Sequence, residues 1–279
     1  MFKSLMYYFL LILFCAVPSS LTAEENTDKK PAKVLWIAHR GECFDAPENT
    51  IPAFKLALDR NADGIECDIR LTSDGKLIAC HDATTKRTGN ADRIISQSTY
   101  KDLQTVDVSN KKKGFKDTKI PLFADVLKIL GKRICYVEIK SAEPSILTEI
   151  VKCIDNAGIP AEQVILISFN ANIIKKYKEL YPDRKALWIT GFRAFDNGTW
   201  KYTADELIEK LKAINADGVS IQANMQFLNA SYVQKVKNAG FSFSVWTVDR
   251  GDLAKKLIDI GVDSITSNRA TILKQEFSK

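Results

Sequence analysis

The sequence predicts an α/β protein folded as a closed (β/α)8 barrel with a hairpin excursion after the second strand. Short β-branched runs alternate with amphipathic stretches along most of the chain, and eight of these runs can be parallel strands. No glycine-rich nucleotide-binding motif follows any of them. Eight parallel strands suit a closed barrel better than an open doubly wound sheet.

The eight strands are predicted from short runs of mostly apolar, strand-forming residues. They lie at residues 34–39, 64–69, 134–139, 164–169, 186–190, 218–222, 241–248 and 264–267. A further run, at 77–80, follows an Asp-Gly pair within residues 71–82. Asp-Gly between two apolar runs is a hairpin signal, so this run is predicted as a hairpin arm after the second strand.

Helices are predicted between the strands, where apolar residues recur at three- and four-residue spacing. Many of these segments begin with Thr, Asn, Ser or Pro and several end at Gly, as helices do. Thr203 and Glu206 form the pattern of a capping box. The segments lie at residues 50–62, 121–131, 144–158, 172–181, 203–216, 231–240 and 252–261.

The first residues differ in kind from the rest. An apolar run at 6–17 follows Lys3, and small polar residues come next. This pattern predicts a signal peptide over 1–23, a polar linker over 24–33 and the barrel domain over 34–279, hence export to the periplasm or the cell exterior. A retained N-terminal anchor is the alternative. Lipoprotein processing at Cys15 is disfavoured by the preceding Phe14.

The charge of the chain points to no nucleic-acid partner. The formal charge is +6, and the basic segment 110–119 lacks the interleaved aromatic residues typical of nucleic-acid binding. Membrane contact is compatible with the sequence but not required, and nothing indicates an oligomeric state.

The five cysteines after the leader lack CxxC spacing, which argues against a zinc site or a disulfide framework. Cys67, Cys80 and Cys135 are predicted to be buried thiols.

Charged residues gather where the early predicted strands end. They are His39 and Arg40 after the first strand, Glu66 and Asp68 on the second, His81 and Asp82 after the hairpin arm, and Glu138 and Lys140 on the third. Catalytic groups of a (β/α)8 barrel lie at this end of the strands. Glu66 and Asp68 share one face of their strand, and both point inward if Cys67 points outward.

The three carboxylates of Glu66, Asp68 and Glu138 predict a metal site. Buried charges are costly unless they are paired or bind a cation. Carboxylate oxygens suit Mg²⁺, Ca²⁺ or Mn²⁺, whereas zinc is less favoured.

The neighbouring bases predict phosphoryl chemistry. His39 and His81 could serve as general acid and general base, because imidazole titrates near neutral pH. Arg40 and Lys140 could bind a phosphate. Both histidines of the chain lie at such strand ends, a coincidence that favours a functional interpretation.

Each residue also has a structural interpretation. The alternatives are ion pairs of Glu66 with Arg70 and of Glu138 with Lys140, a loop cap at Asp82, a helix cap at Asn49 or Thr50, and barrel packing or a pocket wall for Trp246.

Taken in order, a series of motifs resembles the glycerophosphodiester phosphodiesterases, in their compact, bacterial, secreted form. The resemblance spans about residues 34–268, and the series is specific as a set. The motifs are AHRG (38–41), APENT (46–50), GIECDIRLTSDGKLIACHD (64–82), KRTGN (86–90), PLFADVL (121–127), VEIK (137–140) and VWTVD (245–249).

The resemblance implies a TIM-barrel hydrolase that uses one divalent cation to cleave a small-molecule glycerophosphodiester into glycerol 3-phosphate and an alcohol. By motif, the residues match as follows: His39 and His81 the acid/base pair, Glu66, Asp68 and Glu138 the metal ligands, Arg40 the phosphate-binding arginine, Lys140 the lysine beside the third ligand, and Glu48 a mainly structural acid. Trp246 is assigned to the substrate pocket.

Two departures from the family pattern bear on substrate preference. TSN (266–268) stands where the family often has Thr-Asp, and Gln222 replaces a different polar residue. Independently of these departures, two rival functions are considered: phospholipase D-like action on a lysophospholipid or sphingolipid, and a catalytically silent barrel that binds phosphate esters.

Overall fold

The computed structural model describes residues 33–109, 112–192 and 202–278. The predicted signal peptide, and the predicted linker except for Lys33, lie outside the described residues.

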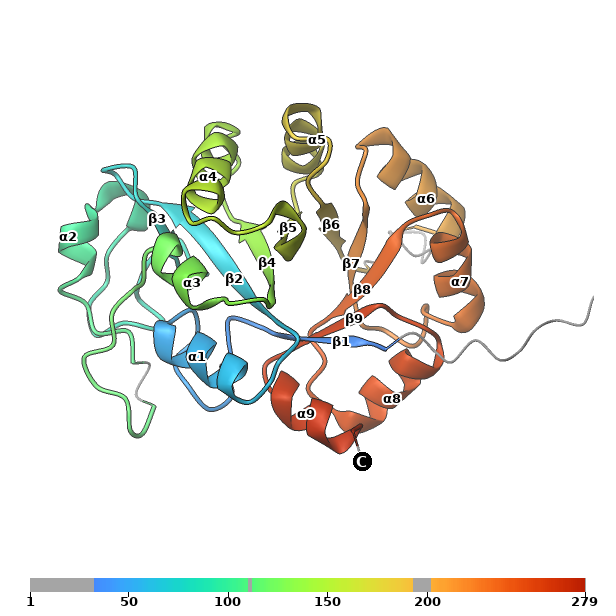
Figure 1. Cartoon of the computed structure of the whole chain (residues 1–279), viewed down its shortest axis with the longest axis horizontal. Helices are drawn as coiled ribbons and strands as arrows, with labels where there is room; N and C mark the ends of the chain where they lie inside the picture. Colours follow the sequence, from blue (N-terminus) through green and yellow to red (C-terminus); the bar gives the residue numbers. More distant parts are fainter. Residues whose placement is uncertain (1–32, 110–111, 193–201, 279) are drawn as a thin grey trace, which may run out of the picture. The chain divides into compact units, whose positions relative to one another are not determined.

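Eight parallel strands form a closed barrel, as the sequence predicts (Figure 1). Their order around the barrel is β1, β9, β8, β7, β6, β5, β4, β2, and pairing of β1 with both β9 and β2 closes it. The strands are β1 Leu35–Ala38, β2 Gly64–Leu71, β4 Ile134–Ile139, β5 Val164–Ser168, β6 Ala186–Thr190, β7 Gly218–Gln222, β8 Ser242–Trp246 and β9 Ser264–Ser267.

The predicted hairpin arm is also present. Strand β3, Leu77–Ala79, pairs antiparallel with β2 and does not join the parallel barrel. The excursion continues through the 3₁₀ helix η1 (Ile95–Gln97) and the short helix α2 (Tyr100–Leu103). A small apolar cluster holds this excursion together; its buried members are Ile78, Cys80, Ile95, Leu103, Val106, Val108 and Ile120.

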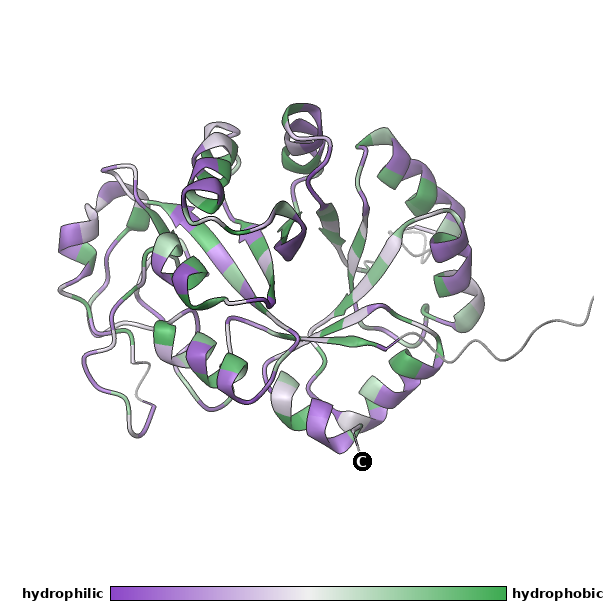
Figure 2. Cartoon of the chain, in the orientation of Figure 1, coloured by the Kyte–Doolittle hydropathy of each residue, from purple (hydrophilic) through white to green (hydrophobic). Residues whose placement is uncertain are grey.

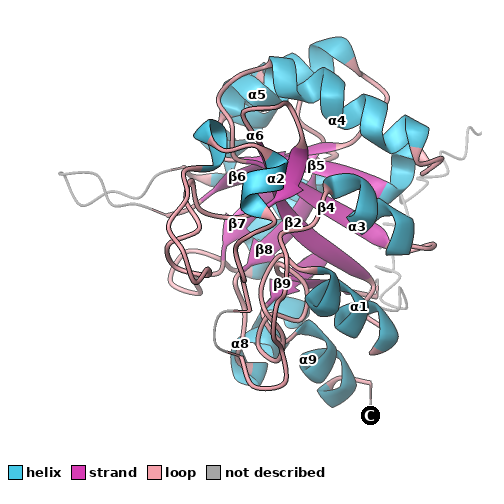
Figure 3. Ribbon diagram, turned by 90° about the vertical axis from the view of Figure 1, so that its left-hand side faces the viewer, coloured by secondary structure: helices cyan, strands magenta, loops and turns pink. Residues whose placement is uncertain are grey.

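Helices surround the barrel, as the side view shows (Figure 3). Each predicted helical segment contains a helix: α1 Ile51–Asp59, α3 Phe123–Ile129, α4 Ser145–Asn156, α5 Ala171–Leu180, α6 Ala204–Ala213, α7 Ala230–Asn238 and α8 Gly251–Asp259. The capping box at Thr203 and Glu206 is formed. The 3₁₀ helix η2 (Ala161–Gln163) and the last helix, α9 (Ala270–Glu276), were not predicted.

Two apolar layers lie on opposite faces of the strands. The inner layer fills the barrel with Ile37, Tyr136, Ile165, Ile167, Leu187 and Ile189. The outer layer packs the strands against the helices and includes Cys67 and Cys135, whose sulfurs are 3.8 Å apart. Cys67 therefore points outward, which turns its neighbours Glu66 and Asp68 inward. Figure 2 shows the helices carrying both hydrophobic and hydrophilic residues, as two-sided elements should.

Within the described ranges, no helix combines the length and the hydrophobicity that a bilayer span would require.

Candidate active site

A pocket of about 140 Å³ opens at the carboxyl ends of the strands. Seven of the eight predicted site residues line it: His39, Arg40, Glu66, His81, Glu138, Lys140 and Trp246. The eighth, Asp68, is fully buried and contacts Arg40 and Lys140 of the lining. The structure thus brings together residues that the sequence spreads over more than 200 positions.

The turn after β1 aims His39 and Arg40 at this pocket. Arg40 and Gly41 both have left-handed backbone conformations, with φ of 55° and 80°. A Cβ atom on Gly41 would lie 2.6 Å from the carbonyl carbon of Ala53, so α1 leaves room only for glycine there. The turn places the Arg40 amide 2.8 Å from Glu66 Oε2, to which it donates a hydrogen bond.

Three buried carboxylates form the floor of the site. Glu66 and Asp68 come from β2, and Glu138 lies on β4 directly beside Asp68 in the strand register. One oxygen from each lies within 4.8 Å of the others. Burial, together with the charges of the neighbouring carboxylates, raises the pKa of Glu66 well above its usual value and that of Glu138 to about 7.

Two cations partly neutralise this floor. Lys140 Nζ lies 2.5 Å from Glu138 Oε1 and 2.9 Å from Asp68 Oδ1. Arg40 Nε lies 3.3 Å from Asp68 Oδ2. Burial acts to raise the pKa of Asp68, but Lys140 and Arg40 outweigh it and lower that pKa. The predicted Glu138–Lys140 ion pair is therefore present, within a larger cluster.

The predicted alternative of a Glu66–Arg70 ion pair is wrong. Arg70 instead donates from Nε and Nη2 to the carbonyl oxygen of His81, at 3.0 and 2.7 Å. This contact fixes the backbone of the second histidine. Arg70 lies on the same face of β2 as Glu66 and Asp68, so the two-residue period could have revealed it.

The donor set fits a hard divalent cation. Glu66 Oε1 is buried and has no hydrogen-bond partner, although an unpaired buried carboxylate oxygen is costly. Three carboxylates against two cationic side chains leave an excess of negative charge. Oxygen donors of this kind are the ligands that Mg²⁺, Ca²⁺ and Mn²⁺ prefer.

The two histidines face the pocket with different partners behind them. His39 Nδ1 lies 2.7 Å from Asn268 Oδ1, and its Nε2 lies 4.0 Å from Glu66 Oε2. His81 Nδ1 lies 2.6 Å from Asp82 Oδ1, and Asp82 Oδ2 accepts from Arg87 Nε, so Asp82 orients a histidine instead of capping the loop. Burial lowers the pKa of both imidazoles. At His81, the negative charge of Asp68 is the largest influence in the opposite direction.

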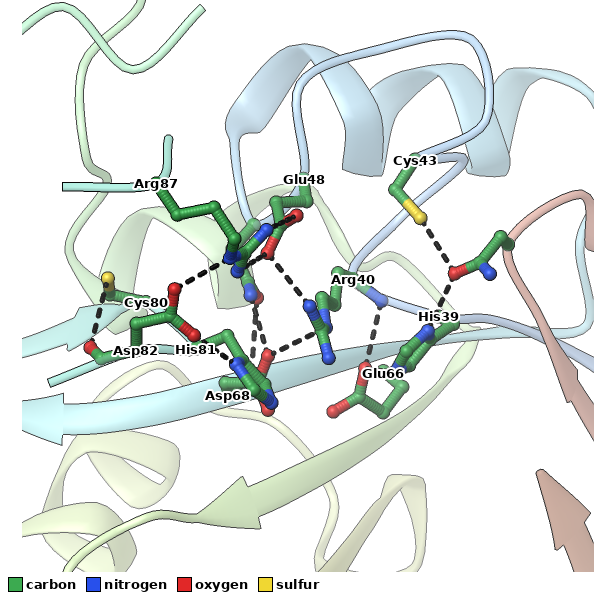
Figure 4. A network of polar contacts seen from close by, with 12 residues as sticks. His39, Arg40, Cys43, Glu48, Glu66, Asp68, Cys80, His81, Asp82 and Arg87 are labelled. Atoms are coloured by element: carbon green, nitrogen blue, oxygen red, sulfur yellow. Dashed lines mark hydrogen bonds and ion pairs between the residues drawn. The ribbon is translucent and has the colours of Figure 1, made fainter. Parts of the chain in front are cut away.

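Arg87 connects the residues around Arg40 with those around His81 (Figure 4). It donates two hydrogen bonds to Glu48, at 2.6 and 2.8 Å, and a third, from Nε, to Asp82 at 2.6 Å. Glu48 in turn accepts from Arg40 Nη1 at 2.9 Å. Arg87 lies in the KRTGN motif but was not among the predicted site residues.

The helix-cap alternative at Asn49 or Thr50 resolves into two roles. Thr50 is the N-cap of α1 and accepts from the Ala53 amide. Asn49 instead holds Asp68: its Nδ2 donates to Asp68 Oδ2 at 2.7 Å, and its Oδ1 accepts from the Asp68 amide at 3.1 Å.

The remaining wall of the pocket is apolar. Trp246 donates from Nε1 to the Ser220 carbonyl at 3.0 Å, which leaves its ring as a pocket wall. Phe169 meets Trp246 edge to face at 5.5 Å and is 53% exposed. Ile167 and Ile189 belong to this wall, and the hydroxyl residues Ser220, Thr247 and Thr266 also line the pocket. The pocket therefore has a charged side from the early strands and an apolar side from the later ones.

Comparison with known proteins agrees with this geometry. The family model for the glycerophosphoryl diester phosphodiesterase family matches residues 39–271. The chain is 31% identical over 245 residues to a glycerophosphodiester phosphodiesterase of Caldanaerobacter subterraneus subsp. tengcongensis, covering 85% of this chain and 94% of that protein. It is 26% identical over 275 residues to a glycerophosphodiester phosphodiesterase of Bacillus subtilis, covering 92% of this chain and 91% of that protein.

Solved structures show the same fold. A phosphodiesterase of Oleispira antarctica, in complex with the product sn-glycerol-3-phosphate, superimposes with a TM-score of 0.78 at 22% identity, covering 89% of this chain and 98% of that one. A glycerophosphodiester phosphodiesterase of Parabacteroides distasonis superimposes with a TM-score of 0.72 at 24% identity, covering 89% of this chain and 98% of that one. With a family model that matches most of its length, the chain belongs to the glycerophosphoryl diester phosphodiesterase family of enzymes.

Proposed function

We propose that this phosphodiesterase hydrolyses glycerophosphodiesters to glycerol 3-phosphate and an alcohol, with a divalent cation held by Glu66, Asp68 and Glu138 and with His39 and His81 moving the protons. The observation that carries the proposal is the buried carboxylate cluster, with an unpaired oxygen on Glu66, directly beside two pocket-facing imidazoles.

The residues divide the work of one displacement at phosphorus. Arg40 and Lys140 line the pocket and can orient the phosphate by charge and hydrogen bonding. When bound, a divalent cation supplies positive charge to the phosphoryl oxygens. One histidine takes the proton of the attacking water, which gives glycerol 3-phosphate directly, or of the glycerol 2-hydroxyl, whose attack gives a cyclic phosphate that water opens in a second displacement. The other protonates the oxygen of the alcohol as its bond to phosphorus breaks.

The partners of the two histidines favour one assignment. Asp82 is a carboxylate, and a carboxylate beside an imidazole stabilises its protonated form. Asn268 offers His39 only a neutral amide. We therefore assign His81 as the general acid and His39 as the general base.

The size of the pocket favours a deacylated diester over a lysophospholipid or sphingolipid. Its volume of about 140 Å³ lies below the ~300–1,000 Å³ typical of pockets for larger ligands. The apolar wall around Trp246 and Phe169 suits the carbon skeleton of glycerol or of a small alcohol, and leaves little room for an acyl chain.

The proposal is tested by following glycerol 3-phosphate release from glycerophosphocholine with Mg²⁺, Ca²⁺ or Mn²⁺ and after chelation. We expect activity that chelation abolishes and that His39→Ala and His81→Ala each lower at least 100-fold. Asn156→Leu, an exposed change at the far end of α4, should behave like the parent. Parent-like turnover in both histidine variants would refute the proposed chemistry. Faster turnover of lysophosphatidylcholine would favour the lipid alternative.

We also propose that the enzyme is exported, on the strength of residues 1–23. Sequencing the N-terminus of protein recovered outside the cytoplasm should find a chain that begins near Glu24. A cytoplasmic chain that begins at Met1 would contradict export.

A further inference from the structure

We infer that Asn268 and Asp249 are positioning residues for His39: they hold its ring with the proton on Nδ1, so that Nε2 presents a lone pair to the pocket. Only the kinetic consequence of this inference rests on the proposed function. The inference itself follows from hydrogen bonds whose donors and acceptors can be deduced one after another.

Asp249 can only accept hydrogen bonds, because its side chain is a carboxylate. Asp249 Oδ1 accepts from Ser267 Oγ at 3.0 Å and from the Asn268 amide at 2.8 Å. Its Oδ2 lies 2.6 Å from the side-chain nitrogen of Asn268. The end of the Asn268 side chain that faces Asp249 must therefore be its NH₂ group.

The other end of that amide is then an oxygen, and it faces His39. Asn268 Oδ1 lies 2.7 Å from His39 Nδ1 and 2.9 Å from Cys43 Sγ. Because a carbonyl oxygen can only accept, His39 Nδ1 must carry a proton. A neutral imidazole has a single N–H, so Nε2 is left with its lone pair.

The barrel fixes this arrangement through its backbone. Ala38 and Ser267 are paired in the register of β1 and β9, and the His39 amide donates to the Ser267 carbonyl at 2.9 Å. His39 follows Ala38 and Asn268 follows Ser267. The two residues therefore lie side by side where β1 and β9 end. Asp249 follows β8, the neighbour of β9 on its other side.

Asn268 Oδ1 is the acceptor that the described residues give His39 Nδ1, so its loss removes the contact that selects the Nδ1–H form. The ring could rotate, and its proton could move to Nε2, where it would block proton abstraction from the nucleophile. Substrate contacts made by Arg40 and Lys140 would be unaffected. We therefore expect Asn268→Leu, a change of similar size, to lower kcat at least tenfold and to change KM less than threefold.

The tautomer can be read directly, because the chain has only two histidines. In the full-length protein labelled with ¹⁵N-histidine, two-bond ¹H–¹⁵N spectra distinguish a protonated ring nitrogen from an unprotonated one. We expect the neutral His39 of the parent to show a protonated Nδ1 and an unprotonated Nε2. The His81→Gln variant assigns the signals. In Asn268→Leu, the His39 pattern should change and that of His81 should not.

Each outcome bears on the inference. An Nε2-protonated His39 in the parent overturns it without any variant, and so does an unchanged His39 pattern in Asn268→Leu. A changed pattern with parent kcat removes the catalytic role. The far-end control Asn156→Leu should alter neither readout. If the parent is inactive on glycerophosphocholine, the proposed function fails while the tautomer measurement still stands.

Discussion

Glu42, the residue after the AHRG motif, shows how a single buried carboxyl can tie the turn after β1 to the end of the chain. It is fully buried, and its Oε1 accepts from Thr271 Oγ1 at 2.8 Å. The Thr271 amide donates to the other oxygen at 3.4 Å. Burial raises the pKa of Glu42, since the hydrogen bonds from Thr271 only partly offset the loss of hydration.

This shift predicts a pH-dependent difference between parent and Glu42→Gln. A carboxyl whose pKa is higher in the folded than in the unfolded state binds its proton more tightly when folded. Its contribution to the free energy of unfolding is therefore full at low pH and is lost as the pH rises through the folded pKa. Glu42→Gln avoids that loss, so the variant should gain stability relative to the parent as the pH rises above the ordinary glutamate pKa of about 4.3.

Urea unfolding at several pH values measures this difference, and comparison with the parent cancels the other titrating groups. Glu42→Ala is the matched variant: it removes the acceptor for Thr271 and should cost about 1–3 kcal/mol at every pH. A parallel pH dependence in the parent and Glu42→Gln would contradict a raised pKa.

At the scale of elements, Arg87 fastens the excursion after β3 to the loop that precedes α1. Glu48 on one loop and Asp82 on the other both accept from its guanidinium. Glu48 also binds Arg40, and Asp82 orients His81. The relative position of Arg40 and His81 therefore depends on this contact.

We expect Arg87→Ala to lower kcat/KM at least tenfold and to speed hydrogen exchange over residues 81–90, because Asp82 and Glu48 lose a shared donor. Arg87→Lys should recover little, since an ammonium cannot reproduce the forked geometry. Arg93→Ala, an exposed arginine of the same excursion, is the control. Equal kcat/KM in Arg87→Ala and Arg93→Ala would show that the contact does not matter for turnover.

Features with a periodic sequence pattern were predictable, whereas several that lack one were not. The strands, the hairpin arm and α1 to α8, apart from the four-residue α2, follow from apolar spacing and caps. Helix α9, of seven residues, was missed. Likewise, the charged strand ends were predictable because register places them together. Arg87 was not, because its role depends on a contact between distant loops. Asn268 and Asp249 follow the adjacent strands β9 and β8, so register could have revealed them too.

For the whole molecule, the carboxylate floor predicts that metal and fold are coupled. Mutual repulsion of buried carboxylates destabilises the folded state, and a cation that binds only this state stabilises it by about 2.7 kcal/mol at 100 times its Kd. For a barrel of this size we expect Mg²⁺ or Ca²⁺ to raise Tm by roughly 5–10 °C, and chelation to reverse the rise.

Glu66→Gln should lose most of this metal-dependent rise together with activity, while it keeps an oxygen for the Arg40 amide. Calorimetric titration and thermal unfolding of the same sample measure both effects. Glu149→Gln, which changes an exposed acid on α4, should retain the parent response. A full metal-dependent rise in Glu66→Gln would remove Glu66 from the ligand set.

The pocket's charged side comes from β1 to β4 and its apolar side from β5, β6 and β8. In evolutionary terms, the two halves of the barrel can diverge under separate selection. Substitutions at Phe169, Ile189 or Trp246 could alter the alcohol accepted while the catalytic half is inherited unchanged. Grafting the later half of a relative onto the first four strands of this chain should therefore transfer substrate preference, provided that the graft keeps Asp249 and Asn268, which hold His39.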